Sequence, residues 1–508
     1  MKNKVTAIAA ALLLAAGCSN YLDVNHDPDA LAEIPDAKAL LPAAEVSIAN
    51  NLMGWDFGFG AGFWVEYWTQ SYTASQFKTL CEFQPEDFGT AYLSLTREAM
   101  ADLNRMIALS TGDEDKGYYF IAEALSIFTW QIITDVWGDM PYSEALKGNE
   151  GILHPKQDKG EDIYADLLTR VDKLLEVDLS EALVDGRYDF IFEGDLEAWQ
   201  FFAVGLKLKL MLRLSQTPGF NNEEVHQFIV ENEEALYYLA AYYEGAKIPG
   251  SVWDDSREGK RHPLREFEAG GAGYFSANVI GCKTFVDYLK ENSDPRLETL
   301  FEGTEGAFFG DFDSKEDSDE NGTTDDKETY STVVFDGNTN LFIMSGWEVA
   351  FYMAEVFACA GDLDNAQRYY ELGVKLSLTQ HGVDDLSIIE SGGYAEWQGG
   401  TAEQCVKQIA MQKWVASCNY QHIEAFLERN RTKYPAVNEM DIAADRKAAF
   451  VNFPVGELTI SVRGRARLNG NLPASPLYPE EYIFRNNNAP AQKPDIGQKV
   501  WWNQKQEK

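Results

Sequence analysis

Long stretches of helical hydrophobic patterning constrain the fold of this chain more than any other feature. In each stretch, apolar residues recur at positions i, i+3 and i+4, the spacing that places them on one face of an α-helix. The stretches are 91–109, 117–137, 160–175, 196–214, 223–234, 348–359, 364–381 and 402–430. Alternating patterning is scarce, and 457–462 is the best candidate for a strand. The sequence therefore predicts an all-α protein with long connecting loops.

Two of these stretches are joined in the manner of a helical repeat. Gly361 lies in the short turn between 348–359 and 364–381, and the small residues Ala354 and Ala366 allow the two helices to approach closely. Tyr370 and Val374 continue the apolar stripe of the second helix. The pattern resembles a tetratricopeptide-type hairpin. Any pair of antiparallel helices needs a similar turn, so one hairpin does not identify a repeat family.

The first eighteen residues have the pattern of an export signal. Lys2 and Lys4 precede an uncharged run over 5–16, which is shorter than the roughly 20 residues that a membrane-spanning helix needs. Gly17 and Cys18 follow and resemble a lipobox, in which the cysteine is lipidated and becomes the new N-terminus, although Ala15 stands where leucine is usual. The alternative is an ordinary cleaved signal with an incidental Cys18. We predict a lipoprotein signal peptide over 1–17 and acylation of Cys18.

Charge and cysteine content exclude several classes of protein. The chain has 81 Asp and Glu against 43 Lys and Arg, a net charge of −38. This excess repels phosphate backbones and argues against nucleic acid as a partner, whereas neutral ligands and cations are compatible with it. Solubility of an exported protein explains the acidity equally well. The five cysteines after Cys18 are scattered and odd in number, which indicates neither a disulfide framework nor a zinc site.

Short sequence blocks carry a resemblance over nearly the whole mature chain. They are YLDVNHDP at 21–28, LLPAA at 40–44, TDVWGDMPYSEAL at 134–146, DPRL at 294–297, QKW at 412–414, EAF at 424–426, RTKYP at 431–435 and YPEEY at 478–482. In this order they resemble the SusD/RagB-like nutrient-binding outer-membrane lipoproteins, specifically the SusD-like branch. One departure is Asn430-Arg431 followed by Lys433, where the family usually has two arginines before its Tyr-Pro block.

The resemblance implies a fold, a location and a role. It implies a single α-helical domain over 18–508, with four tetratricopeptide-like hairpins as a scaffold and a variable, loop-rich face that binds ligand. It also implies a lipid anchor in the outer membrane, facing the cell exterior. There the protein would cover a partner TonB-dependent transporter and capture nutrient for import, with an oligosaccharide or polysaccharide as the leading ligand. Capture of peptides by the same architecture is the alternative.

Aromatic residues in the predicted loops are the candidate ligand contacts. Sugar rings pack their apolar faces on flat aromatic side chains, while planar polar groups bind their hydroxyls. From the predicted loops 52–77, 251–275 and 392–401 we select Trp68, Tyr72, Trp253, Tyr274 and Trp397. The alternative for each is a partly buried packing residue. Four tryptophans on helical stripes are assigned to the core: Trp130, Trp199, Trp347 and Trp414.

An acidic segment has the spacing of a calcium loop. Residues 317–328, DSDENGTTDDKE, match the pattern D-x-[DN]-x-[DN]-G-x₅-E without a gap. The predicted Ca²⁺ ligands are Asp317, Asp319, Asn321, Thr323 (through its carbonyl), Asp325 and Glu328. No helical pattern precedes the segment, so it would be an isolated structural calcium site. The alternative is a solvated acidic loop.

Enzyme signatures are missing from the sequence. The chain has no GxSxG, HExxH or Walker motif, and its six histidines do not have the spacing of metal ligands. A glycosidase needs only two carboxylates, but no pair is singled out among so many acidic residues. The family that the chain resembles is also non-catalytic. We therefore predict no catalytic residues, with a secreted glycosidase as the alternative from a different class.

Overall fold

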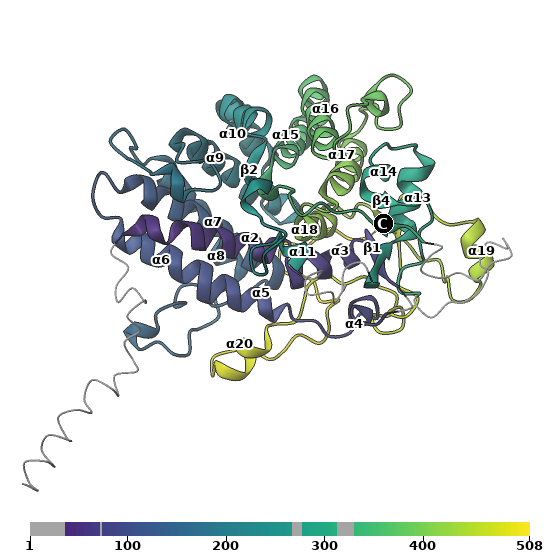
Figure 1. Cartoon of the computed structure of the whole chain (residues 1–508), viewed down its shortest axis with the longest axis horizontal. Coiled ribbons are helices and arrows are strands. Elements are labelled where there is room, and N and C mark those ends of the chain that lie inside the picture. The colour runs from purple at the N-terminus through teal and green to yellow at the C-terminus, as the bar shows by residue number, and fades with distance from the viewer. Residues whose placement is uncertain (1–35, 72–73, 267–276, 312–329, 508) are drawn as a thin grey trace, which may run out of the picture.

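A computed structural model describes residues 36–71, 74–266, 277–311 and 330–507. Helices dominate it, and consecutive helices pack against one another along much of the chain (Figure 1). Helices α6 to α9 lie at one end of the molecule, α15 to α17 lie along the top of the view, β1 and β4 lie toward the other end, and β2 lies near α9 and α10. In this described part, no helix combines the length and the apolar character needed to cross a membrane.

The helices and strands have the following bounds. The α-helices of the first half are α2 (Leu41–Leu52), α3 (Ala61–Trp64), α4 (Lys78–Cys81), α5 (Gly89–Ser94), α6 (Met100–Leu109), α7 (Lys116–Trp137), α8 (Gly160–Leu175), α9 (Leu196–Arg213) and α10 (Asn222–Tyr237). Those of the second half are α11 (Pro263–Glu266), α13 (Lys283–Glu291), α14 (Leu297–Leu300), α15 (Gly346–Ala360), α16 (Leu363–Gln380), α17 (Ala402–Ser417), α18 (His422–Thr432), α19 (Arg446–Val451) and α20 (Glu480–Arg485). In the part of the chain that the structure describes, three segments are π-helical: η2 (Trp55–Gly60), η3 (Leu95–Ala99) and η7 (Tyr238–Tyr242).

The strands are short, and within the described residues they form three small sheets. They are β1 (Trp68–Gln70), β2 (Gly245–Ile248), β3 (Val279–Gly281), β4 (Phe301–Glu302), β5 (Thr332–Val333), β6 (Leu341–Ser345), β7 (Ala436–Asn438) and β8 (Glu457–Thr459). The first sheet has the order β1-β3-β5-β4, with Trp68 opposite Gly281. β2 pairs antiparallel with β6, and β7 pairs parallel with β8. The strand predicted over 457–462 is present as its first three residues.

The helical patterning predicted most of the long helices to within a few residues. α8 has the predicted bounds, and α7 ends at Trp137 because Gly138, at φ 85°, takes a conformation that few other residues adopt. The start of α9 is fixed by Asp195, whose side chain accepts hydrogen bonds from the first amides of the helix. The four tryptophans assigned to the core are all buried, which confirms that assignment: Trp130, Trp199, Trp347 and Trp414.

The hairpin predicted around Gly361 is confirmed. α15 and α16 pack side by side, and Gly361 has φ 84°, in the left-handed region that ends a helix without strain in glycine. Close approach also depends on Gly373 of α16, where a Cβ atom would lie 2.6 Å from the ring of Phe351 on α15. Small residues therefore set the distance between these two helices.

Two expectations about secondary structure are wrong. The single helix predicted over 402–430 is interrupted, because Cys418 is extended and Asn419 has φ 67°, which starts a new helix at His422. The loop predicted over 52–77 instead contains η2, α3 and β1. Its glycines allow close packing: a Cβ atom on Gly62 would lie 2.7 Å from Nδ1 of His422. The mixture of glycine and aromatic residues here specifies dense packing.

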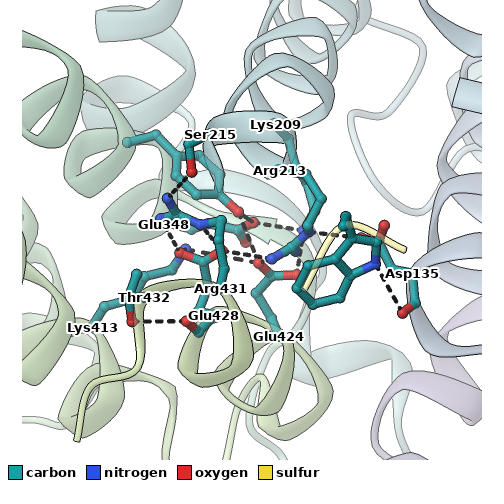
Figure 2. Close-up of polar contacts among 12 residues, drawn as sticks. Asp135, Lys209, Arg213, Ser215, Glu348, Lys413, Glu424, Glu428, Arg431 and Thr432 are labelled. Carbon is teal, nitrogen blue, oxygen red and sulfur yellow. Dashed lines mark hydrogen bonds and ion pairs between the residues drawn. The ribbon is translucent and has the colours of Figure 1, made fainter. Parts of the chain in front are cut away.

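A buried network of charged side chains joins the helices at the centre of the molecule (Figure 2). Lys209 of α9 donates to Glu348 of α15 and Glu424 of α18, each at 2.7 Å. Arg213, one turn further along α9, binds Asp135 of α7 at 2.9 Å and Glu424 at 2.8 Å. Burial alone would raise the pKa of the Glu424 carboxyl, but Arg213 and Lys209 outweigh it and hold the pKa at about 2.

The network continues along α18. Arg431 binds both carboxylate oxygens of Glu355 at 2.6 Å and also contacts Glu428. Lys413 of α17 lies 3.1 Å from Glu428, which also accepts a hydrogen bond from Arg213. Charges removed from water are tolerated only when each has a partner, and here each carboxylate has one. The network therefore fixes how α9, α15, α17 and α18 are oriented.

Candidate functional site

A cleft formed by η2, the helix from α5 to η3, and the segment leading into α11 gathers polar side chains around one tryptophan. In Figure 1, α2, α3 and α11 lie near the middle of the molecule, and α11 packs against α2 and η2. We call this the η2 cleft; its volume is about 340 Å³. It is lined by Asn50, Asn51, Gly54, Trp55, Asp56, Thr90, Ala91, Ser94, Glu98, Gly259, Arg261, Pro263 and Glu266.

Two π-helical turns shape the cleft. In η2 the amide of Phe59 reaches the carbonyl of Gly54, five residues earlier, at 3.3 Å. Gly54 is required there, because a Cβ atom would lie 2.2 Å from the carbonyl oxygen of Asn50. In η3 the amide of Met100 likewise reaches the carbonyl of Leu95. Such wide turns are rare and are frequent at functional sites, since the extra residue redirects the side chains that follow.

Trp55 supplies the aromatic surface of the cleft. Its side chain is half-buried, and its ring centroid lies 5.0 Å from that of Phe77 and 5.8 Å from that of Phe59. These two rings support the indole from behind, so that its orientation is fixed before any ligand arrives. A rigid aromatic surface loses little conformational entropy on binding.

A chain of hydrogen bonds orients the polar groups on the helix side. The amide nitrogen of Asn51 donates to Ser94 Oγ at 3.0 Å, and Ser94 Oγ donates to Glu98 at 2.8 Å. The amide oxygen of Asn51 has no partner among the described residues. It is therefore an oriented acceptor at the cleft, suited to a ligand hydroxyl.

Asp56 is a carboxylate of the cleft whose pKa is raised by its surroundings. Burial raises the pKa of its carboxyl, the amide of Ala91 opposes this by donating at 2.8 Å, and the charge of Asp87 raises the pKa further. The result is a pKa of about 6. Asp56 is therefore ionised at neutral pH and becomes neutral under mildly acidic conditions.

The opposite wall is a segment held together by its own charges. Arg261 donates to the carbonyl of Asp255 at 2.7 Å and lies 3.5 Å from Glu266. Glu266 in turn accepts from the amide of Gly259 at 3.1 Å. With Asp56 and Glu98 across the cleft, the lining has more acidic than basic groups. Such a surface suits neutral or cationic ligands and repels anionic ones.

The structure places two of the predicted aromatic contacts in the core, not on a surface. Trp68 is 0% exposed in β1, with its ring packed against Phe59 and His422. Trp253 is 7% exposed and packs on His262. A ligand cannot stack on a ring that other side chains already cover, so the expectation that these residues form a surface platform is wrong. Trp55, from the same predicted loop as Trp68, is the residue that the sequence analysis passed over.

Of the remaining predicted site residues, the structure describes only Trp397. Trp397 is half-buried, lies 5.1 Å from the ring of Tyr370, and is not part of the η2 cleft. Segments 50–56 and 259–266 do meet in the cleft, so two of the three predicted loops converge, but the loop at 392–401 does not join them. The following lie outside the described residues: Cys18, Tyr72, Tyr274, and the calcium ligands Asp317, Asp319, Asn321, Thr323, Asp325 and Glu328.

A larger cavity lies between α7, α8 and the segment after α7. Its volume is about 580 Å³. The polar groups at its centre already bind one another: Arg170 contacts Glu123 at 2.7 Å and Ser126 at 2.8 Å. Tyr142 is also hydrogen-bonded to Arg170, at 2.9 Å. Because these groups are paired while Asn51 of the η2 cleft retains an open acceptor, the η2 cleft is the better candidate for ligand binding.

Comparison with known proteins identifies the family. The profile of the SusD-like family, described as "Starch-binding associating with outer membrane", matches residues 28–453. The match spans most of the chain, and the chain belongs to this family. No curated protein sequence matches it.

Solved structures share the fold at low sequence identity. One, named a chitin-binding protein, is 19% identical with a TM-score of 0.69, covering 92% of this chain and 100% of that one. A chitin-binding SusD homolog from Flavobacterium johnsoniae is 18% identical with a TM-score of 0.66, covering 91% and 98%. A SusD homolog from Bacteroides uniformis is 20% identical with a TM-score of 0.65, covering 92% and 99%. These likenesses establish the all-α, tetratricopeptide-like architecture.

Proposed function

We propose that this protein is an outer-membrane surface lipoprotein that binds a glycan in the η2 cleft and delivers it to a partner TonB-dependent transporter. The observation that carries the proposal is the combination, in one cleft, of the supported indole of Trp55 with the oriented acceptors of Asn51 and Asp56. Sugars need this pairing of an apolar plane with planar polar groups. Membership of a family described as starch-binding and associated with the outer membrane supports the ligand class and the location.

The charge of the cleft narrows the glycan class. Asp56, Glu98 and Glu266 outnumber Arg261, and the whole chain carries −38. Uronates and sulfated sugars would meet repulsion, whereas neutral hexoses and N-acetylated amino sugars would not. Two structural neighbours are named as chitin-binding, which agrees with this class. Capture of a peptide by the same cleft is the alternative, and a neutral or basic peptide would fit its charge.

The hydrogen bonding of the same residues supports the binding role that we propose. Asn51 and Glu98 hold one another in place through Ser94, and Asp56 is held by the amide of Ala91. The family consists of carbohydrate-binding proteins, and we extend its non-catalytic character to this chain. A reducing-sugar assay with starch and chitin substrates tests this directly, because release of new reducing ends would assign a glycosidase instead.

Binding is tested by calorimetry with maltoheptaose, chitohexaose and a neutral peptide library. Trp55→Ala is expected to weaken binding of the recognised ligand about thirtyfold, since loss of a central aromatic costs roughly 2 kcal/mol. Trp397→Ala is the matched control, because Trp397 is also half-buried but lies outside the cleft. Equal loss in both variants, or loss only with Trp397→Ala, would place the site elsewhere.

Location and partner are tested separately from binding. Cys18→Ala should move the protein from the membrane to the soluble fraction, because each buried CH₂ of a lipid anchor contributes about 0.8 kcal/mol. Incorporation of labelled fatty acid into the variant would exclude Cys18 as the lipidated residue. A tagged wild-type chain purified in mild detergent is expected to retain a TonB-dependent transporter, and its reproducible absence would remove the delivery step.

A further inference from the structure

An exposed group of tyrosines lies at the end of α10 and in η7, and none of them is among the residues that line the η2 cleft. Tyr237, Tyr238 and Tyr242 are 41%, 42% and 72% exposed. A contiguous exposed apolar patch is a feature of interaction sites, whereas single exposed apolar residues are ordinary. We call these three residues the η7 tyrosines. Tyr237 is the last residue of α10, and η7 follows it in the part of the chain that leads from α10 to β2 (Figure 1).

The η7 turn is built to present these rings. The amide of Tyr243 bonds to the carbonyl of Tyr238, five residues earlier, at 3.0 Å. This wide turn adds a residue to the helical register, so the side chains after it no longer follow the buried stripe of α10. The buried positions of η7 are taken by Leu239 and Ala240, which leaves the rings of Tyr238 and Tyr242 facing outward.

The rings are held rigidly by their neighbours. Tyr238 stacks on Phe201 of α9 at 5.9 Å with an interplanar angle of 19°, and Tyr242 packs edge-on against Tyr243 at 4.9 Å. Tyr243 is itself anchored, since its hydroxyl donates to Asp195 at 2.7 Å. The guanidinium of Arg368 lies 5.7 Å from the ring of Tyr237. The surface is therefore ordered before binding, which lowers the entropic cost of capturing a ligand.

Their hydroxyls distinguish the η7 tyrosines from the aromatic residues around them. Tyr243 and Tyr369 each bind a carboxylate, of Asp195 and Glu233 respectively. The hydroxyls of Tyr237, Tyr238 and Tyr242 have no hydrogen-bond partner among the described residues. Aromatic faces next to free hydroxyls are the groups that a sugar, with its apolar C–H face and its ring of hydroxyls, can use together.

We propose that the η7 tyrosines form a second contact surface for a neutral polysaccharide, separate from the η2 cleft. This inference rests on the proposed glycan-binding function. The exposed Glu231, Glu234 and Glu244 flank the three tyrosines in sequence and outnumber Arg368, the cation beside Tyr237, so an anionic polymer or an anionic membrane is disfavoured. A polymer long enough to occupy both surfaces gains avidity without any new contact type, whereas a short oligosaccharide occupies only the cleft.

The test measures whether a bound ligand covers the η7 tyrosines. Wild-type protein and Trp55→Ala are treated with tetranitromethane in the presence of amylopectin, glycol chitin or neutral lipid vesicles, and nitration of each tyrosine is measured by mass spectrometry. We expect one of the polysaccharides to protect Tyr237, Tyr238 and Tyr242 in both proteins. Protection by vesicles alone, or no protection while maltoheptaose or chitohexaose binds the cleft, would overturn this inference and leave the proposed function standing.

A second experiment measures how much the η7 tyrosines contribute to binding affinity. The triple substitution Tyr237→Ala, Tyr238→Ala and Tyr242→Ala should lower affinity for the protecting polysaccharide at least about tenfold while leaving the affinity for its short oligosaccharide unchanged. Phe484→Ala is the control, because Phe484 is 77% exposed and belongs to α20, which lies at the opposite edge of the view from α10 (Figure 1). Polymer affinity equal to wild type in the folded triple variant would overturn the inference. Protection of the tyrosines without any oligosaccharide binding would instead contradict the η2 cleft and retain this surface.

Discussion

Arg431 of α18 and Glu355 of α15 form a doubly bonded ion pair, with two guanidinium nitrogens each 2.6 Å from a carboxylate oxygen. Arg431 is fully buried, and it belongs to the RTKYP block at 431–435 through which the sequence resembles its family. The contact explains why this block has an arginine at that position. A planar guanidinium can bind Glu355 and Glu428 at once, which a lysine ammonium cannot do with the same geometry.

Arg431→Met is expected to destabilise the protein strongly. The substitution leaves Glu355 and Glu428 buried without their main partner, a change that typically costs about 3–5 kcal/mol. The measurement is the free energy of unfolding from denaturant titration. Arg368→Met is the matched control, since Arg368 pairs with Glu233 at 3.1 Å on the surface, where a pair is worth about 0–1 kcal/mol. Similar losses in the two variants would contradict the central role of the network.

Glu66→Gln is expected to stabilise the protein at neutral and alkaline pH. Burial raises the pKa of Glu66 to about 8, although hydrogen bonds from Thr284 and Thr459 oppose the shift. Its folded pKa therefore lies above the ordinary value of 4.5, so the folded state holds an extra proton between pH 4.5 and 8. The free energy of unfolding then falls as pH rises through this window, by at most about 1.4 kcal/mol per pH unit.

Melting temperatures of wild type and Glu66→Gln between pH 5 and 8 test this expectation. The advantage of the variant should grow steadily with pH, because glutamine cannot ionise. Glu181→Gln, at an exposed position, provides the control for the loss of one carboxylate. A difference between wild type and Glu66→Gln that does not change with pH would show that Glu66 does not bind the extra proton.

The long helices could be predicted because their buried faces repeat at helical spacing. The hairpin at Gly361 and the end of α7 at Gly138 could also be predicted, because a glycine directly after a helical pattern commonly ends the helix with a positive φ. The segment from Trp55 to Trp68 could not be assigned in the same way. There the glycines allow close contacts with other parts of the chain: Gly60 meets the ring of Phe88, and Gly62 meets His422, which is 360 residues away in sequence.

The candidate site was less predictable for a related reason. An aromatic residue in a predicted loop can contact ligand or belong to the core. Which of the two it does depends on the side chains that pack around it in space, and the sequence alone does not show these. Trp68 is covered by Phe59 and His422, whereas Trp55, thirteen residues earlier, borders a cleft. The π-helical turn that makes this difference depends on Gly54, and no sequence rule distinguishes it from an ordinary glycine.

Calcium is expected to raise the melting temperature through the segment 317–328. A ligand that binds only the folded state adds about 2.7 kcal/mol at a hundredfold excess over its Kd. The double variant Asp317→Ala, Glu328→Gln should lose this response, because it removes the first and last ligands of the loop. The control is the double variant Asp313→Ala, Glu316→Gln, which removes the same number of negative charges just outside the motif. This control should keep the rise in melting temperature with calcium. A wild-type melting temperature unaffected by chelator and by millimolar Ca²⁺ would leave a solvated acidic loop.

Glycan affinity is expected to fall as pH drops from 7 to 5, through the pKa of Asp56 at about 6. Above this pKa the carboxylate accepts hydrogen bonds from sugar hydroxyls, and below it the protonated acid is a weaker acceptor. A hydrogen bond to a charged group exceeds a neutral one by about 1 kcal/mol, so the loss should be roughly fivefold. Asp56→Asn keeps an oxygen that can accept from the amide of Ala91. The glycan affinity of this variant should therefore stay, at every pH, near the value that the wild type has at pH 5.

Calorimetry at pH 5, 6 and 7 with the oligosaccharide that the wild type binds gives the comparison. Asp102→Asn, a carboxylate of α6 outside the cleft, should retain the wild-type pH dependence. If Asp56→Asn instead keeps the fivefold change, another group in the cleft titrates and Asp56 does not contact the ligand. If Asp56→Asn binds with full neutral-pH affinity throughout, the carboxylate is a structural partner of Ala91 alone, and the ligand is held by Trp55 and Asn51.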